Sequence, residues 1–271
     1  MKQLNPLTLA LVVLVCGTGS FVSAQETPPL DKQAVVRQAR QDYYNLRTLG
    51  LLEFQAGIQP NWEFILKEQV AKDPEAAQAG LKLLNRLHFT LIFDSQGKVT
   101  VNHTEEVAPP NERVAAGFQQ IYGGMSKALS GFFTIWNLFM FDSPLPQVND
   151  TYQMQDVDGQ YRLSYNDGDA DVITMLNRDR EITEISVSAP GFKSSLKPRF
   201  TKTSKGYVLV GYKANYLPTT GSGVTSVVIQ FDDEEVDGFR LPHKLQFDTT
   251  LDGTRYQLEL LLSGYQVKKR W

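Results

Sequence analysis

Cysteine is almost absent from this chain of 271 residues, whose single copy is Cys16. Cys16 lies in an N-terminal segment with the features of a secretory signal peptide: the basic residue Lys2, an apolar run over residues 7–15 and small residues up to Ala24. We expect cleavage after Ala24, so that residues 1–24 are removed together with the thiol. The remaining chain can then form no disulfide, and its stability must come from an apolar core.

Histidine is also scarce, and the three copies do not form the His-Glu-x-x-His spacing of a zinc site. The sequence contains neither a Gly-x-Ser-x-Gly elbow nor a phosphate-binding P-loop. Ser194 and Lys197 match the Ser-x-x-Lys pattern of penicillin-binding enzymes, but the companion motifs are missing. We therefore expect no catalytic residue, no metal and no cofactor. A hydrolase whose site gathers remote residues is the alternative.

Two acidic runs, residues 166–171 and 232–237, also fail to predict a metal site. An EF-hand loop beginning at Asp167 would need Gly where Val172 stands and Glu where Arg178 stands. We expect a solvated turn there. The second run, residues 232–237, is expected to be a solvated hairpin end, with a cation contact as the alternative.

Positive charge and long apolar runs are lacking too. The 27 Lys and Arg residues face 30 Asp and Glu residues, and no basic stripe with interleaved aromatic residues stands out, so we expect no nucleic-acid partner. The apolar run over residues 131–142 is shorter than the roughly 20 residues that a bilayer-spanning helix needs. We expect no transmembrane span in the mature chain.

Strand and turn signals are abundant. From Thr151 onward, alternating apolar and polar residues are separated by tight-turn dipeptides such as Asp237-Gly238 and Asp252-Gly253. This pattern predicts ten to twelve antiparallel strands in a meander. Three helical segments come before or between the early strands, the first from Lys32 to about Thr48. We expect one domain over residues 25–271, with helical insertions at residues 61–87 and 111–142.

The most apolar and aromatic segment beyond the signal peptide is the predicted helix over residues 111–142. Its apolar residues recur at steps of three and four, which draws a stripe along one face, and beyond Gly131 the helix is apolar nearly all round. Such a helix end needs cover from a sheet, a ligand or a bilayer. Its glycines, Gly117, Gly123, Gly124 and Gly131, predict a kink or a close approach of another backbone.

The element order resembles a known family. A signal peptide, an N-terminal helix that leads into a Phe-containing strand, a long meander and the closing Asp-Gly-Phe-Arg-Leu-Pro-His-Lys-Leu strand (residues 237–245) resemble the periplasmic lipoprotein carriers of the LolA type. The resemblance implies an α+β half-barrel, in which a strongly curved antiparallel sheet has its concave face covered by helices around an apolar cavity for acyl chains. It brings no catalytic residue with it.

By the same resemblance, aromatic and thioether side chains of the central helix line this cavity. They are Phe132, Phe133, Trp136, Phe139 and Met140, and we add Phe118 and Met125 from the same stripe. We expect an exported protein, periplasmic or secreted, that is a non-enzymatic carrier or sensor of a lipid-like ligand. Its partner is then a lipid or the acyl chains of a lipoprotein. The alternative is a module that binds a protein of the cell envelope.

Overall fold

The computed structural model describes residues 31–106, 108–148, 150–220 and 223–270, and the expected signal peptide lies outside them. Every helix and strand named below belongs to the unit Lys32–Trp271. These elements form a mostly antiparallel β structure with a few helices. The antiparallel sheet predicted from the sequence is therefore confirmed, and the few helices are compatible with the predicted α+β class.

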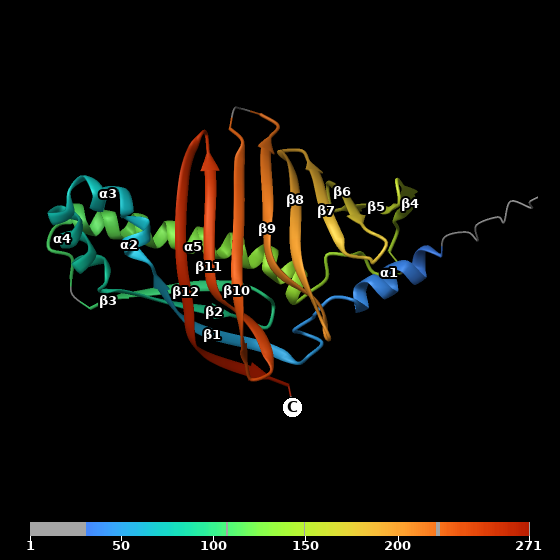
Figure 1. The fold of residues 1–271 in the computed structure, drawn as a ribbon, viewed down its shortest axis with the longest axis horizontal. Coiled ribbons are helices and arrows are strands. Elements are labelled where there is room, and N and C mark those ends of the chain that lie inside the picture. The colour runs from blue at the N-terminus through green and yellow to red at the C-terminus, as the bar shows by residue number, and fades with distance from the viewer. Residues whose placement is uncertain (1–30, 107, 149, 221–222, 271) are drawn as a thin grey trace, which may run out of the picture. The chain divides into compact units, whose positions relative to one another are not determined.

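Twelve strands of the described residues form one sheet (Figure 1). In chain order they are β1 (Leu51–Pro60), β2 (Leu87–Phe93), β3 (Val99–Glu105), β4 (Gln153–Val157), β5 (Gln160–Asp167), β6 (Ala170–Leu176), β7 (Ile182–Ala189), β8 (Phe192–Thr203), β9 (Gly206–Pro218), β10 (Thr225–Val236), β11 (Phe239–Leu251) and β12 (Thr254–Lys269). Across the sheet the order is β3-β2-β1-β12-β11-β10-β9-β8-β7-β6-β5-β4, so β3 and β4 are its edges. From β4 to β12 each strand pairs with the next one in sequence, as in the predicted meander.

Asp-Gly dipeptides make tight turns of this meander. Asp237 and Gly238 connect β10 to β11, and Asp252 and Gly253 connect β11 to β12. In that order their φ angles are 53°, 87°, 49° and 80°. Two consecutive positive φ angles are what a type I′ hairpin turn requires, and Gly and Asp adopt them more readily than most residues. The local sequence therefore fixes where these strands reverse.

The C-terminal strand β12 lies between the first strand, β1, and the late strand β11. It pairs with β11 on one side and with β1 on the other, where Phe54 lies opposite Val267 and Ile58 opposite Leu262. Figure 1 shows β1, β2 and β3 running at a steep angle to β10, β11 and β12. Because β1 and β12 lie far apart in the sequence, this pairing depends on the folded core and not on a local turn.

The helices come before β4. They are α1 (Lys32–Gln41), α2 (Trp62–Ile65), α3 (Lys67–Lys72), α4 (Pro74–Leu84) and α5 (Glu112–Met140). Side-chain caps begin three of them, and two come in the first insertion: Asn61 accepts the N–H of Phe64 before α2, and Asp73 accepts the N–H of Ala76 before α4. α2, α3 and α4 lie within the segment predicted as the first helical insertion, and α5 lies within the second.

The N-terminal helix ends at Gln41, although its apolar pattern predicts a helix to about Thr48. Tyr207 explains the difference. Its N–H donates to the carbonyl of Asp42 at 2.7 Å, and its carbonyl accepts the N–H of Tyr44 at 3.0 Å. The backbone after α1 is thus hydrogen-bonded to β9, and this distant pairing replaces the last helical turns. The predicted C-terminal part of this helix is therefore wrong.

The longest helix, α5, has 29 residues and lies along one side of the sheet (Figure 1). The side chain of Asn111 accepts the N–H of Val114 at 3.0 Å where the helix begins. At its end, the N–H of Phe141 donates to the carbonyl of Asn137 at 3.0 Å. Within the described residues, no helix has both the length and the apolar character needed to cross a bilayer.

The glycines of α5 do not mark a close contact with another backbone. A Cβ atom placed on Gly117, Gly123, Gly124 or Gly131 would find no heavy atom of another element within 4 Å. The close backbone approach predicted from these glycines is therefore wrong. The space beside each of these glycines is open. The apolar stripe on the opposite face of α5 makes its contacts with the sheet.

Candidate functional site

The seven residues predicted to bind a ligand are all buried on α5. The most exposed of them, Phe118, retains 6% of its accessible surface, and five retain only 1%. The set is Phe118, Met125, Phe132, Phe133, Trp136, Phe139 and Met140. The same helical stripe that suggested a ligand-binding wall is thus covered by protein.

Aromatic rings of β1, β2, β10 and β11, strands on either side of β12, pack against α5. Trp136 lies edge-on to Phe54 of β1 and Phe93 of β2, with ring centroids 6.1 and 5.5 Å apart. Phe132 lies edge-on to Phe231 of β10 and Phe247 of β11, at 5.2 and 6.1 Å. Such edge-to-face pairs add to the stabilisation from apolar burial. One helix therefore links strands that lie far apart across the sheet.

The C-terminal end of α5 reaches further along the same sheet. Phe139 lies edge-on to Phe200 of β8, with centroids 5.5 Å apart. The sulfur of Met140 accepts the N–H of Leu209 in β9 at 3.4 Å. These contacts show that the predicted residues form the interface between helix and sheet. Their role in ligand binding stays a prediction.

The N-terminal half of α5 packs on β2 and β3. Tyr122 lies edge-on to Phe89, stacks on the ring of His103 with centroids 3.5 Å apart, and donates its hydroxyl to Glu105 at 2.8 Å. Burial, together with the bond to Glu105, raises the pKa of Tyr122 above its ordinary value. This hydroxyl remains a neutral donor at physiological pH and ties the helix to the edge strand.

Strand register identifies further residues on the side of the sheet that faces α5. Phe247, which touches Phe132, pairs directly with Ile229 and Leu258. Direct partners in an antiparallel ladder point to the same side, and so do residues two apart on one strand. We call this the helix-facing side of the sheet and its reverse the outer side.

Large apolar side chains are exposed on the helix-facing side beyond the reach of α5. Leu251 and Tyr256, on β11 and β12, retain 45% and 57% of their surface, and Phe192 and Tyr216, on β8 and β9, retain 41% and 37%. Half-buried apolar residues occupy neighbouring positions on the same side. We call the whole set the uncovered surface: Phe192, Tyr216, Leu251, Tyr256, Val187, Val227 and Leu258.

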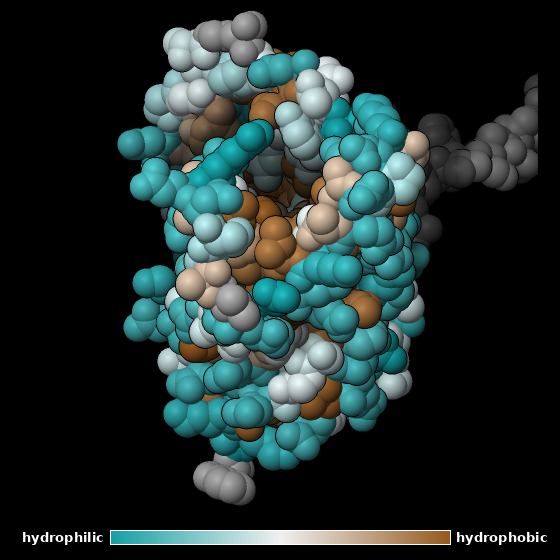
Figure 2. Space-filling view, turned by 90° about the vertical axis from the view of Figure 1, so that its left-hand side faces the viewer, coloured by the Kyte–Doolittle hydropathy of each residue, from teal (hydrophilic) through white to brown (hydrophobic). Residues whose placement is uncertain are grey.

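Figure 2 views the protein from the side on which Figure 1 labels α3 and α4. A hollow opens on this side. Hydrophobic residues are visible inside this hollow, whereas the surface around it is mostly hydrophilic. Scattered apolar residues are ordinary on a protein surface, but apolar residues gathered in a depression mark a place of interaction. The hollow is therefore the first candidate for a binding site.

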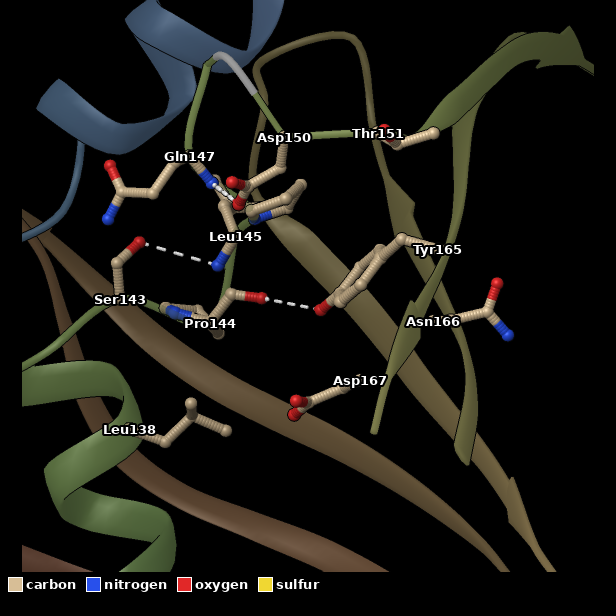
Figure 3. Close-up of a pocket in the computed structure, with 11 residues that line it drawn as sticks. Leu138, Ser143, Pro144, Leu145, Gln147, Asp150, Thr151, Tyr165, Asn166 and Asp167 are labelled. Carbon is tan, nitrogen blue, oxygen red and sulfur yellow. Dashed lines mark hydrogen bonds between the residues drawn. The ribbon is translucent and has the colours of Figure 1, made fainter. Parts of the chain in front are cut away.

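A second depression, the loop pocket, lies between the end of α5, the segment over residues 143–151 and β5 (Figure 3). Its volume is about 520 Å³. Tyr165 of β5 donates its hydroxyl to the carbonyl of Pro144 at 3.3 Å across one wall. Arg40 of α1 holds the same segment from behind, since its guanidinium donates to the carbonyls of Leu145 and Pro146 at 2.5 and 3.1 Å.

Among the described residues that line the loop pocket, the charged side chains are both acidic, Asp150 and Asp167. The carboxylate of Asp150 accepts the N–H of Gln147 at 2.5 Å, and Figure 3 shows the carboxylate of Asp167 pointing toward Leu138. Burial raises the pKa of Tyr165, so its hydroxyl stays protonated as a donor. The pocket offers polar contacts but no nucleophile beside a base.

The Ser-x-x-Lys pattern does not assemble into a reactive pair. Ser194 pairs with Tyr216 and therefore points to the helix-facing side of β8. Lys197 pairs with Lys213 and points to the outer side, where its ammonium lies 3.5 Å from Glu184. Residues an odd number of positions apart on a strand face opposite ways, so these two side chains cannot meet.

The histidines lie in separate places. His88 contacts Glu106 at 2.8 Å and His103 stacks on Tyr122, whereas Nδ1 of His243 lies 2.9 Å from the carbonyl of Leu262. Across the part of the chain that the structure describes, no three His, Cys, Asp or Glu residues gather closely enough to hold a metal ion.

Both acidic runs lie where two strands meet at a turn. The run that begins at Asn166 spans the β5–β6 hairpin, and the amide of Asn166 donates to Asp171 at 2.7 Å across it. The run over residues 232–237 ends β10, and Asp233 accepts a hydrogen bond from Arg240 at 2.9 Å. Both runs therefore lie at the predicted turns, but Asp233 is not solvated, because its side chain retains only 14% of its surface and pairs with Arg240.

Sequence reasoning placed the candidate site on the helix and missed the uncovered surface. The strands show the necessary alternation, for example Thr249, Leu251, Thr254 and Tyr256 around one turn. Whether a given strand residue lies on the helix-facing side or the outer side depends on the register of five strands. Whether it stays uncovered depends on how far the contacts of α5 extend along the sheet. A local sequence pattern determines neither of these properties.

No family model matches this chain, and no curated protein or solved structure is significantly similar to it.

Proposed function

We propose that this protein binds a lipid-like ligand, with an acyl chain or similar apolar tail, against the uncovered surface. In this proposal the sheet curves as an open half-barrel, α5 lies along its concave face, and the uncovered surface lines the hollow of Figure 2. The observation that carries the proposal is the exposure of Leu251, Tyr256, Phe192 and Tyr216 on the one side of the sheet that is otherwise apolar and buried.

The energetics favour an apolar ligand. Removing a methylene group from water contributes about 0.8 kcal/mol, so a chain of ten methylenes gains about 8 kcal/mol before the costs of association. The tyrosines Tyr216 and Tyr256 have hydroxyls at the ends of apolar rings, and Thr225 and Thr249 add hydroxyls on the same side. A surface with apolar bodies and hydroxyl tips suits an amphiphile better than a pure hydrocarbon.

The buried residues of α5 have a supporting part in this proposal. Phe132 and Phe139 pack beneath strands β8 to β11, so they hold the strands that form the uncovered surface. A ligand would reach the predicted set itself if α5 moved away from the sheet. In either case an exported protein, periplasmic or secreted, would act as a carrier or sensor without a chemical reaction.

The test is mass spectrometry of organic extracts from the mature protein, purified without detergent from its export compartment. We expect a lipid to co-purify at near one molecule per chain. A folded protein that carries no lipid, and that takes up none from vesicles of its own membrane lipids, would contradict the proposal. Recovery of one stoichiometric envelope protein in its place would favour the protein-binding alternative.

A further inference from the structure

The outer side of β8 and β9, opposite the uncovered surface, carries a row of hydroxyl and amide side chains. Ser186, Ser195, Asn215 and Ser226 are direct partners across strands β7, β8, β9 and β10, so their side chains lie side by side. Within the described residues, the hydroxyl of Ser195 and the amide of Asn215 make no side-chain hydrogen bond. The centre of the row therefore has donors that the protein itself does not use.

Lysines lie on both sides of this row, along strands β8 and β9. Lys193 lies two positions before Ser195 on β8, and Lys213 lies two positions before Asn215 on the antiparallel strand β9. Two residues along a strand span about 7 Å, so the two lysines lie on opposite sides of the Ser195–Asn215 pair. Lys197, the direct partner of Lys213, adds a third positive charge on the same side as Lys213.

The lysines are available because few acids oppose them. Glu184 lies 3.5 Å from Lys197, and Asp171 already accepts the amide of Asn166 at 2.7 Å. Neither Lys193 nor Lys213 takes part in an ion pair within the described residues, and both are exposed. In a chain whose net charge is −3, this outer patch is locally positive.

The side chain of Arg199 adds a further cation to the patch. The next cross-strand pair beyond Lys197 and Lys213 joins Arg199 to Gly211. A Cβ atom on Gly211 would lie 3.2 Å from the guanidinium nitrogen Nη2 of Arg199, so this side chain lies close over the glycine. The positive charge therefore continues along β8 from Lys193 to Arg199.

The patch is hollowed where the hydroxyls gather. A depression of about 480 Å³ lies on β6 to β9, large enough for a phosphate group with its substituent. Ser186, Ser188, Lys193, Ser195 and Asn215 line it together with the carboxylate of Asp171 and the apolar side chains of Ile173 and Leu217, and Lys213 lies beside it on β9. Hydroxyl and amide donors with lysines on either side provide the charge-assisted hydrogen bonds that a phosphate accepts.

We propose that this outer depression binds a phosphate group, held by Lys193 and Lys213 and by the donors of Ser195 and Asn215. The phosphate can belong to a soluble phosphomonoester or to a phospholipid headgroup at a membrane surface. The site lies on the reverse of the uncovered surface, so it does not depend on the proposed lipid-binding function. Either function can fail while the other holds.

The test measures phosphate binding directly. Titration of the folded mature protein with inorganic phosphate, followed by amide chemical shifts, is expected to move the resonances of residues 193–197 and 213–215 and to weaken as salt is raised. Flotation with vesicles of phosphatidylglycerol and phosphatidylcholine, against phosphatidylcholine alone, separates the two sources. Vesicle binding that inorganic phosphate displaces would assign the headgroup, and shifts without vesicle binding would assign a soluble ligand.

Paired variants give the control. Lys193→Gln with Lys213→Gln should weaken phosphate binding by about tenfold or more, since each removes a charge-assisted hydrogen bond. Lys82→Gln with Lys127→Gln removes the same net charge from exposed positions on α4 and α5 and should leave binding unchanged. An equal loss of phosphate affinity in both double variants would show that only the net charge matters and would contradict the proposed site. So would the absence of any shift with phosphate together with no vesicle binding.

Discussion

Trp136 of α5 lies edge-on to Phe93 of β2, with ring centroids 5.5 Å apart and ring planes at 89°. Phe93 in turn stacks on Phe54 of β1, at 4.8 Å and 10°. Through these three rings the apolar end of the helix joins two strands that come much earlier in the chain. The cover that this helix end needs is thus provided, at least in part, by the protein's own sheet.

Replacement of Trp136 by Ala should therefore destabilise the fold. The side chain retains only 1% of its accessible surface, so its loss leaves a large cavity among aromatic rings. We expect the free energy of unfolding to fall by about 3–5 kcal/mol, measured by chemical denaturation. Tyr256→Ala, at a position with 57% exposure, is the control and should change it by less than about 1 kcal/mol. Similar losses in both variants would contradict the assignment of Trp136 to the core.

Gly206 of β9 allows residues 42–44, which follow α1, to lie close to this strand. Its φ angle is +113°, and a Cβ atom there would lie 2.6 Å from the carbonyl oxygen of Asp42. Gly206→Ala should lower the free energy of unfolding by more than about 1 kcal/mol, because both the conformation and the contact oppose a side chain. Gly131→Ala, in the open face of α5, should instead raise it by up to about 1 kcal/mol. The same sign of change in both would be inconsistent with this geometry.

The sequence predicts the local elements well and the distant pairings poorly. The Asp237-Gly238 and Asp252-Gly253 turns follow from residue type, because positive φ angles favour those residues. The same holds for the start of α5, where Asn111 caps the helix. The pairing of β1 with β12 and the early end of α1 at Gln41 depend on contacts with distant strands. No local pattern encodes them.

The candidate site shows the same division. The apolar stripe of α5 correctly identifies residues that need cover, among them Phe132 and Trp136. Which cover they receive depends on the sheet, and the structure gives them ring partners on β1, β2, β10 and β11. The exposed residues Leu251 and Tyr256 do not stand out in the sequence, because single apolar residues beside a turn are common.

A charge on the uncovered surface should abolish binding of a lipid-like ligand. Tyr216→Asp places a carboxylate among apolar side chains, and we expect at least a tenfold loss of binding, measured with a fluorescent fatty acid probe. Leu217→Asp is the matched control, because Leu217 is the next residue on β9, retains 49% exposure and points to the outer side. Unchanged binding in a folded Tyr216→Asp protein would count against the proposed surface.

The acid stability of the protein should depend on Glu259. Its carboxylate accepts hydrogen bonds from the amides of Gln246 and Asn61, both at 2.8 Å, and lies 3.0 Å from the ammonium of Lys244. These contacts, the two amides first, lower the pKa of Glu259 from 4.5 to about 2. Because the folded pKa is the lower one, the carboxylate stabilises the fold fully above about pH 4.5 and loses this effect as the pH falls toward 2.

Glu259→Gln should accordingly flatten the acid limb of the stability curve. The measurement is the free energy of unfolding of both proteins from pH 7 to pH 2, with Glu63→Gln, a residue exposed on the short helix α2, as the control. We expect the difference between Glu259→Gln and the original protein to shrink as the pH falls below 4.5. A difference that stays constant over this range would show that the titration of Glu259 contributes nothing.

Tyr43 gives the last prediction, because its hydroxyl satisfies two backbone groups in the core. It accepts the N–H of Ile182 at 2.6 Å and donates to the carbonyl of Arg180 at 3.2 Å. Tyr43→Phe keeps the ring, which lies edge-on to Phe200, and removes only the oxygen. The N–H of Ile182 is then buried without this acceptor, which should cost about 1–3 kcal/mol of stability.

Two comparisons make the Tyr43 result specific. Tyr256→Phe removes a hydroxyl from an exposed ring and should leave the free energy of unfolding unchanged within about 0.5 kcal/mol. Hydrogen exchange of the Ile182 amide should quicken in Tyr43→Phe more than exchange of amides at the far end of β7, because the lost bond is local. If stability and exchange at Ile182 both stay the same, the hydroxyl does not hold the start of β7. If they change as expected, the Tyr43 hydroxyl holds the start of β7 alongside the ion pair between Asp42 and Arg180, whose atoms lie 2.6 Å apart.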